Sequence, residues 1–161
     1  MLAVIEKSGN GYLAQFERHL KHSIEDVWAY LTENDLLCKW FSELHVEELK
    51  KGGLIKFDMG DGTFEEITIL DLEHHAILEY TWGDDTVRFE LQKEAGGCQL
   101  ILKESIKTLT KHTPKDLAGW HVCLDVIQAL LDGKTIDSRE EEWKKWYEQY
   151  VKNVEVYNEM K

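Results

Sequence analysis

Three charged residues occupy strand positions that the surrounding pattern otherwise fills with apolar side chains. Arg18 alternates with Phe16 and Leu20 in a segment that has the two-residue period of a β-strand. Glu66 and Glu104 stand in the same way among apolar residues of later segments. If these strand faces are concave, the three charges lie in or beside a cavity, where they pair with each other or hold the polar group of a ligand. The alternative is that bulges or edge positions place them in solvent.

The histidines do not have the spacing of a metal site. Such a site needs three or four converging ligands. His19 and His22 span a strand end and a turn, so their rings need not converge. His74 and His75 are neighbours in a predicted turn, where we expect their side chains to point apart. His121 differs because it follows Trp120 in a helical segment. It is either a polar anchor of a cavity or a surface or core histidine with its own partners, and we predict no metal.

The chain carries no recognisable catalytic motif. The G-x-S-x-G elbow of serine hydrolases is absent from the sequence. Cys123 lies in an apolar helical stretch, where a thiol is buried and inert. Gly133-Lys134-Thr135 resembles the end of a phosphate loop, but Gln128 replaces the required earlier glycine and a helix precedes it. We therefore predict no catalytic residue and no cofactor.

Composition limits the classes of function further. The 161 residues suit one domain whose core forms without disulfides or metal. A net charge of −12, with no basic run, argues against nucleic acid binding. No stretch approaches the roughly 20 apolar residues of a membrane span. The three cysteines, Cys38, Cys98 and Cys123, lack C-x-x-C spacing, as is typical of reduced, buried thiols, so we expect a cytoplasmic protein.

Two short helices are expected after the first strand. Ser23 begins a capping box, and Ile24 starts a run of apolar residues at helical spacing. Thr32 is placed to cap the second helix, which we expect to end near Cys38.

A long helix is bounded at both ends. Thr113 is the expected cap, Pro114 suits the first helical position, and Asp116 closes the capping box. Gly133 is a natural end for this helix. The helix is the only predicted element large enough to cover a sheet.

The remaining segments have the alternation of β-strands separated by glycine-containing turns. Besides a first strand at 12–20, strands are expected from about residue 44 and at 54–59, 63–72, 76–82, 86–93 and 98–106. Consecutive hairpins build an antiparallel meander. We predict an α+β fold in which a curved antiparallel sheet of about six to seven strands wraps around the long helix. The space between them is either filled by side chains or open to a ligand.

This order of elements, with several short motifs, resembles a known family. The motif residues are Arg18, Ser23, Val27-Trp28, Leu31-Thr32, Trp40-Phe41, Tyr80-Thr81-Trp82 and Gly119-Trp120. In these the chain is similar to bacterial START-like (SRPBCC) proteins of the heat-shock-ATPase-activator C-terminal-domain type, which share the helix-grip fold of the birch-pollen allergen. The resemblance covers about residues 10–133. It divides the chain into a helix-grip domain at 1–136 and an additional helix at 137–161.

The resemblance implies a cavity between sheet and helix but no catalytic residues, since relatives bind lipids, hormones or polyketides, or assist a chaperone. We expect non-enzymatic binding of a hydrophobic small molecule or lipid. The alternatives are a chaperone-associated interaction module and a polyketide cyclase-like enzyme, which requires a histidine or carboxylate with a perturbed pKa inside the cavity. The candidate cavity residues are Phe16, Arg18, Trp28, Phe57, Glu66, Tyr80, Trp82, Phe89, Glu104, Trp120, His121 and Leu124.

The last predicted helix, at 138–161, carries a stripe of aromatic residues. Trp143, Trp146, Tyr147 and Tyr150 recur on one face. An exposed stripe of this size is rare on soluble monomers, so we expect it to pack on protein. It packs either on its own domain, near the end of the long helix, or on its twin in a dimer. The sequence leaves monomer and homodimer open.

Overall fold

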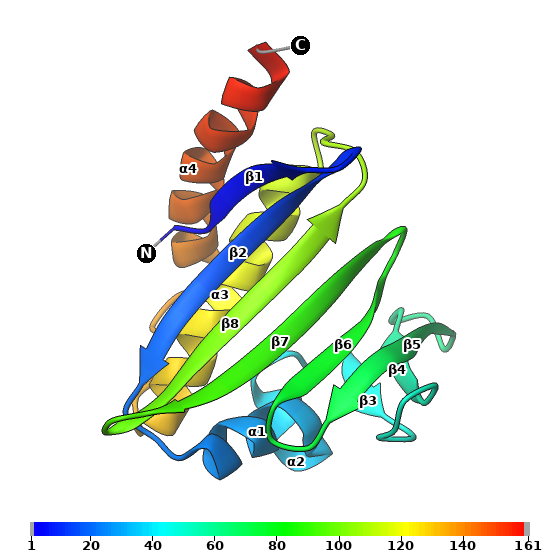
Figure 1. Cartoon of the computed structure of the whole chain (residues 1–161), viewed down its shortest axis with the longest axis vertical. Helices are drawn as coiled ribbons and strands as arrows, with labels where there is room; N and C mark the ends of the chain where they lie inside the picture. The colour runs from blue at the N-terminus through cyan, green and yellow to red at the C-terminus, as the bar shows by residue number, and fades with distance from the viewer. Residues whose placement is uncertain (1, 160–161) are drawn as a thin grey trace.

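Residues 2–159, the part of the chain that the computed structural model describes, form eight strands and four helices (Figure 1). The strands are β1 (Val4–Ser8), β2 (Gly11–Leu20), β3 (Leu44–Val46), β4 (Leu54–Asp58), β5 (Phe64–Glu73), β6 (Ile77–Trp82), β7 (Asp85–Glu94) and β8 (Gly97–Ile106). The helices are α1 (Ile24–Thr32), α2 (Asn34–Trp40), α3 (Thr113–Leu131) and α4 (Arg139–Glu159).

The strands form one sheet in the order β1-β2-β8-β7-β6-β5-β4-β3, and every neighbouring pair is antiparallel. α3 lies across one face of this sheet (Figure 1), so the predicted α+β helix-grip fold is confirmed. The described residues contain more than the six to seven strands expected, because β1 was not predicted. Ile5 is its one buried side chain, and an edge strand of this kind lacks apolar alternation.

Large side chains fill the centre of the space between α3 and the sheet. Phe16, Tyr80, Phe89 and Leu124 are each at most 2% exposed. The ring of Phe89 lies 6.0 Å from that of Trp120 on α3. Burial of a side chain of this size contributes about 1.5–3 kcal/mol. This cluster therefore holds the helix on the sheet.

The face of β5 that packs on the core is the opposite of the one that we expected. Ile67 and Ile69 are buried, whereas Glu66 is exposed. Both phases of alternation in this strand carry apolar residues, and the partner strand decides between them. Ile67 lies opposite the buried Ile55, and Glu66 lies opposite Lys56. The prediction that Glu66 faces the cavity is therefore wrong.

Two helix ends form as predicted. The Ser23 hydroxyl accepts a hydrogen bond of 3.1 Å from the backbone N–H of Asp26. Gly133 follows α3 with φ of 70°, in the left-handed region that favours glycine. The next N–H, of Lys134, donates to the carbonyl of Ala129 at 2.7 Å, which closes a Schellman motif.

Thr32 does not cap the second helix. α2 has Glu33 at its N-cap, without a side-chain cap hydrogen bond. The Thr32 hydroxyl instead donates to the carbonyl of Trp28, one turn earlier in α1, at 2.9 Å. A backbone carbonyl within reach thus competes with capping for this threonine.

The capping box expected at the start of α3 is also wrong. Thr113 is the first residue of the helix, and its hydroxyl accepts from the N–H of Thr110 in the preceding loop. Asp116 does not reach back to the helix start. Its carboxylate accepts a hydrogen bond from the indole N–H of Trp82 on β6. A tertiary contact therefore takes the place of a local one.

α4 packs along α3 (Figure 1) and buries the aromatic stripe against it. Tyr150 is fully buried, and the ring of Trp146 stacks on His121 at 4.0 Å. The indole N–H of Trp143 donates to a backbone carbonyl of α3 at 3.3 Å. The stripe therefore docks on the chain's own α3. The last two residues of the helix predicted at 138–161 lie outside the described part.

The hydroxyl of Tyr150 ties α4 to the start of the chain, because it accepts from the N–H of Ala3 at 2.9 Å. In Tyr150→Phe this buried N–H loses its partner. We expect the free energy of unfolding to fall by about 1–3 kcal/mol, measured by urea denaturation. Tyr147→Phe, on the same helix but only half-buried, is the control and should change it by less than about 0.5 kcal/mol. Equal effects would contradict this role of Tyr150.

Removal of residues 138–161 should lower the melting temperature or the solubility. The truncation uncovers the surface of α3 that α4 buries, including His121, which is 1% exposed in the full chain. Exposed apolar surface of this kind promotes aggregation. Thermal denaturation and gel filtration of the truncated and full chains measure both effects. A truncated chain of equal stability and solubility would show that α4 is dispensable.

Candidate ligand-binding site

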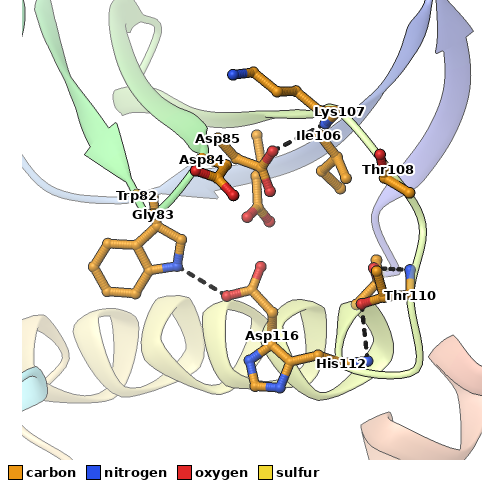
Figure 2. A pocket seen from close by; sticks show the side chains of 12 residues that line it. Trp82, Gly83, Asp84, Asp85, Ile106, Lys107, Thr108, Thr110, His112 and Asp116 are labelled. Carbon is orange, nitrogen blue, oxygen red and sulfur yellow. Dashed lines mark hydrogen bonds between the residues drawn. The ribbon is translucent and has the colours of Figure 1, made fainter.

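A cavity of about 540 Å³ opens between the first turns of α3 and the ends of β6 and β8 (Figure 2). Its walls come from the β6–β7 turn, the end of β8 with the loop after it, and the start of α3. The lining residues are Trp82, Gly83, Asp84, Asp85, Glu104, Ile106, Lys107, Thr108, Thr110, His112, Thr113 and Asp116.

A second cavity, of about 260 Å³, shares Trp82 and Asp116 with the first. It lies deeper along α3, and its walls are more aromatic. Its other lining residues are Trp40, Phe41, Ser42, Glu43, Gly119, Trp120, Cys123 and Arg139. The two cavities therefore meet at Trp82 and Asp116.

Trp82 is the central aromatic side chain of this region. Its ring centroid lies 4.9 Å from that of Trp120 and 5.7 Å from that of Phe41. Phe57, half-buried on β4, lies 6.0 Å from the same ring. The indole N–H of Trp82 donates to Asp116 Oδ1 at 2.9 Å, and Figure 2 shows this carboxylate reaching up from α3. Packing and hydrogen bonding thus fix the position of the Trp82 ring.

Glu104 is a buried carboxyl group that lines the first cavity. It is 1% exposed, and neither of its oxygens has a hydrogen-bond partner among the described residues. Burial raises the pKa of Glu104 well above its ordinary value, and the neighbouring side chain of Asp116 and the charge of Asp85 raise it further. Glu104 therefore favours its protonated form.

The mouth of the cavity is acidic. Asp84 and Asp85 lie on the wall opposite Asp116 (Figure 2), and the buried Glu104 adds a fourth carboxyl group to the lining. Lys107 also lines the cavity, and its backbone N–H donates to Asp85 at 2.9 Å. The carboxyl groups thus outnumber the cationic side chains around this space.

Three predicted site residues line these cavities, namely Trp82, Glu104 and Trp120. Phe16, Tyr80, Phe89 and Leu124 are core residues that fill the space instead, and Phe57 supports Trp82 from behind. Those five remain candidates only for a ligand that displaces side chains.

Trp28 lies in a separate aromatic cluster. Its ring packs edge-on against His74 and His75, at 5.9 and 6.2 Å. The two histidine rings are 3.8 Å apart, so the expectation that they point apart is wrong. Trp28 therefore packs against the β5–β6 turn and does not line either cavity.

Arg18 and His121 form a buried polar network with α4 and do not line either cavity. His121 Nδ1 lies 2.8 Å from the Tyr150 hydroxyl, and its Nε2 lies 3.5 Å from an Asp125 oxygen. Arg18 lies 3.7 Å from Asp125 and 3.5 Å from His121 Nε2. Burial, with the charge of Arg18, lowers the pKa of His121 to about 3, so its ring is neutral at pH 7. Asp125 of α3 and Tyr150 of α4 thus supply side-chain partners of this network.

Asp116 and Phe41 are site residues that the sequence analysis did not select. Asp116 was assigned to a capping box, and Phe41 was noted only as part of a motif. The sequence did carry one signal for an acceptor such as Asp116. Trp82 lies next to a turn, and an indole N–H at a strand end needs an acceptor nearby.

The cysteines are free thiols, and two of them are buried as expected. Burial raises the pKa of Cys98 to about 11 and that of Cys123 to about 12, so both are poor nucleophiles at pH 7. Cys38 is exposed, which corrects the expectation that all three are buried.

Within residues 2–159, no three His, Cys, Asp or Glu side chains come together to hold a metal ion. No helix in this range is long and apolar enough to cross a membrane.

The raised pKa of Glu104 predicts how stability depends on pH. Above the ordinary pKa of an unfolded glutamate, about 4.3, the folded chain binds one more proton than the unfolded chain. Stability should therefore fall as the pH rises from about 4.3 through the raised pKa. Glu104→Gln removes this loss. In denaturation experiments between pH 4 and 9, the free energy of unfolding of the variant should therefore rise relative to that of the wild type as the pH rises. Glu66→Gln, an exposed matched change, should follow the wild-type curve, and parallel curves for all three proteins would refute the assignment.

Comparison with protein families identifies relatives of this chain. The profile of the family described as Activator of Hsp90 ATPase homolog 1-like protein matches residues 21–132. No curated protein matches the sequence significantly.

Solved structures share the fold over three quarters of the chain or more. A conserved protein of unknown function, EF2215 from Enterococcus faecalis, is 25% identical with a TM-score of 0.84, over 96% of this chain and 91% of that one. CalU16 from Micromonospora echinospora is 18% identical with a TM-score of 0.72, over 95% and 94%. DynU16, from the dynemicin biosynthetic locus, is 21% identical with a TM-score of 0.65, over 76% of this chain and 48% of that one.

The family match spans more than half of the chain, and the structural matches share its sheet and helices. The chain therefore belongs to the Activator of Hsp90 ATPase homolog 1-like family, within the START-like (SRPBCC) superfamily.

Proposed function

We propose that this protein binds a compact apolar or aromatic small molecule at the two cavities that meet at Trp82 and Asp116, without catalysing a reaction. Family membership supports a ligand-binding or activator-like role in general. The observation that carries the specific proposal is the cavity pair, of about 540 and 260 Å³. Ligand sites typically enclose about 300–1,000 Å³, a range that includes the larger cavity, and they combine apolar walls with a few polar groups.

The filled centre of the fold favours a compact ligand over a long acyl chain. Phe16, Tyr80 and Phe89 occupy the space into which a lipid tail would extend. The two cavities that reach between α3 and the sheet lie towards the start of α3. The rings of Trp82 and Trp120 offer aromatic surfaces there, and the buried indole N–H of Trp120, with no partner among the described residues, is free to donate to a ligand.

A chaperone-associated role is the second candidate, and the family description alone supports it. Purified protein added to the bacterial Hsp90 would test it. Stimulation of ATP hydrolysis at stoichiometric amounts, together with a stable complex in gel filtration, would place this role above ligand binding.

An enzymatic role of the polyketide cyclase type is favoured by one observation. The predicted condition was a histidine or carboxylate with a perturbed pKa inside the cavity, and Glu104 meets it. Turnover would separate the two roles once a ligand is known. An enzyme should lose turnover in Glu104→Gln while it retains the ligand, whereas a binding protein has no turnover to lose.

Location and assembly remain part of this proposal. We infer a cytoplasmic protein, because the three cysteines are free thiols. α4 covers its aromatic stripe on α3, which favours a monomer over a dimer built on that stripe. Native mass spectrometry of the purified protein reports the subunit count and any retained ligand together.

Gly119 gives a direct test of the cavity as the binding site. A Cβ atom at Gly119 would meet no atom within 4 Å apart from its chain neighbours and the nearby backbone of its own helix, and Gly119 lines the second cavity, so a larger side chain has room to extend there. Gly119→Leu should block ligand retention, seen by native mass spectrometry. It should also leave the protein as stable as the wild type or more so, by up to about 1 kcal/mol, because leucine favours the helix. Gly119→Ala, which adds one methyl group, is the control and should retain the ligand. Unchanged retention in Gly119→Leu would exclude this cavity.

A further inference from the structure

Glu104 is the feature of this cavity that packing alone does not explain. It occupies a core position of β8 and lies opposite Ala14 on β2 and Val87 on β7. Neither apolar neighbour offers a hydrogen bond to the carboxyl group. Buried carboxyl groups normally have partners, and the absence of one lowers stability. Neither oxygen of Glu104 makes a hydrogen bond of ordinary geometry in the described chain, although the Asp116 carboxyl group lies near enough to raise its pKa, and Glu104 lines the cavity.

The charged groups around Glu104 are mostly acidic. Asp116 from α3 and Asp85 from the β6–β7 turn both act on it, and Asp84 lines the same space. Lys107 and His112 are the other titratable groups of the wall, and their side chains are exposed. A ligand carboxylate or phosphate entering here would meet repulsion, whereas a cation would be attracted. The net charge of −12 adds to this preference, because it attracts cations from solution.

We propose that the cavity recognises a protonated primary or secondary amine attached to an apolar or aromatic body, with the ammonium group bound between Glu104 and Asp116. This inference rests on the proposed function and names the chemical class of its ligand. An ammonium nitrogen supplies two or three N–H donors, which is what the unpartnered oxygens of Glu104 require. The body of the ligand lies against Trp82, whose ring also attracts a nearby cation.

Asp116 is able to take part while it holds Trp82 in place. The indole N–H of Trp82 donates to its Oδ1. A carboxylate accepts up to about four hydrogen bonds, so Asp116 keeps acceptor capacity for the ligand. The Trp82 bond therefore positions both the aromatic wall and one of the two anionic groups.

Binding of an ammonium group also has a proton balance. In the free protein Glu104 carries a proton, and its neighbour Asp116 disfavours its loss. When the ammonium group binds, Glu104 ionises and releases that proton to solvent, while the amine keeps its own. Amine binding should therefore release up to one proton and should strengthen as the pH rises until it passes the raised pKa of Glu104 in the free protein, and it should weaken above the pKa of the amine.

The test is titration calorimetry with three probes of similar size, namely tryptamine, indole-3-propionate and 3-methylindole. At pH 7.5 tryptamine should bind about tenfold or more tightly than either of the others. Its measured heat should depend on the ionisation enthalpy of the buffer, as proton release requires. Glu104→Gln should remove the preference for the amine. The matched exposed change Glu66→Gln should keep it.

Each outcome decides one of the two levels of the proposal. Preferential binding of tryptamine that is lost in Glu104→Gln supports the inference. Binding of 3-methylindole or indole-3-propionate with equal or higher affinity overturns it and leaves the proposed binding function intact. Binding of none of the three overturns it as well, and native mass spectrometry of Gly119→Leu then decides the parent proposal separately. If Glu104→Gln does not fold, Asp116→Asn serves in its place, because an asparagine oxygen still accepts from Trp82.

Discussion

On the side of α3 that faces the sheet, apolar residues are buried only where the sheet brings side chains long enough to reach them, while α4 covers another side of the helix. Eleven of its residues are buried, from Thr113 to Ile127. In the centre of the fold, Phe16 and Phe89 extend from the sheet and fill the gap. Near the start of the helix the facing elements are a tight turn and a loop, whose short polar side chains do not fill it. The cavity is the part of this interface that side-chain packing leaves open, and the site residues are those that line the gap.

The order and type of the elements were predictable because their signals are local. A serine cap, a glycine in the left-handed region and a change of apolar period each depend on a few neighbouring residues. The face of β5 was not predictable in this way. Its two faces carry apolar residues alike, and the choice is made by Ile55 and Lys56 on a different strand. The edge strand β1 was missed for a related reason, because hydrogen bonds to β2 define it more than its own side chains do.

The polar residues of the interior show the same limit more sharply. Arg18, Glu104 and His121 all interrupt apolar patterns, and the sequence placed them together in one cavity. The structure separates them according to which element supplies a partner. Tyr150 of α4 reaches His121, twenty-nine positions away in the chain, and Asp125 lies near Arg18. Such long-range pairing carries no periodic signal. Glu104 is the one left without a partner among the described residues.

That exception has an energetic meaning. β8 alternates regularly, with Leu100, Leu102 and Ile106 buried on the same face as Glu104. A leucine at position 104 would satisfy the same pattern without the cost of an unpartnered carboxyl group, about 1–3 kcal/mol. A domain with a total stability of about 5–15 kcal/mol bears such a cost at few positions. Local rules are broken in this way chiefly at functional sites, where a ligand supplies the missing partner. The carboxyl group that weakens the free protein is therefore the group best placed to select what the cavity binds.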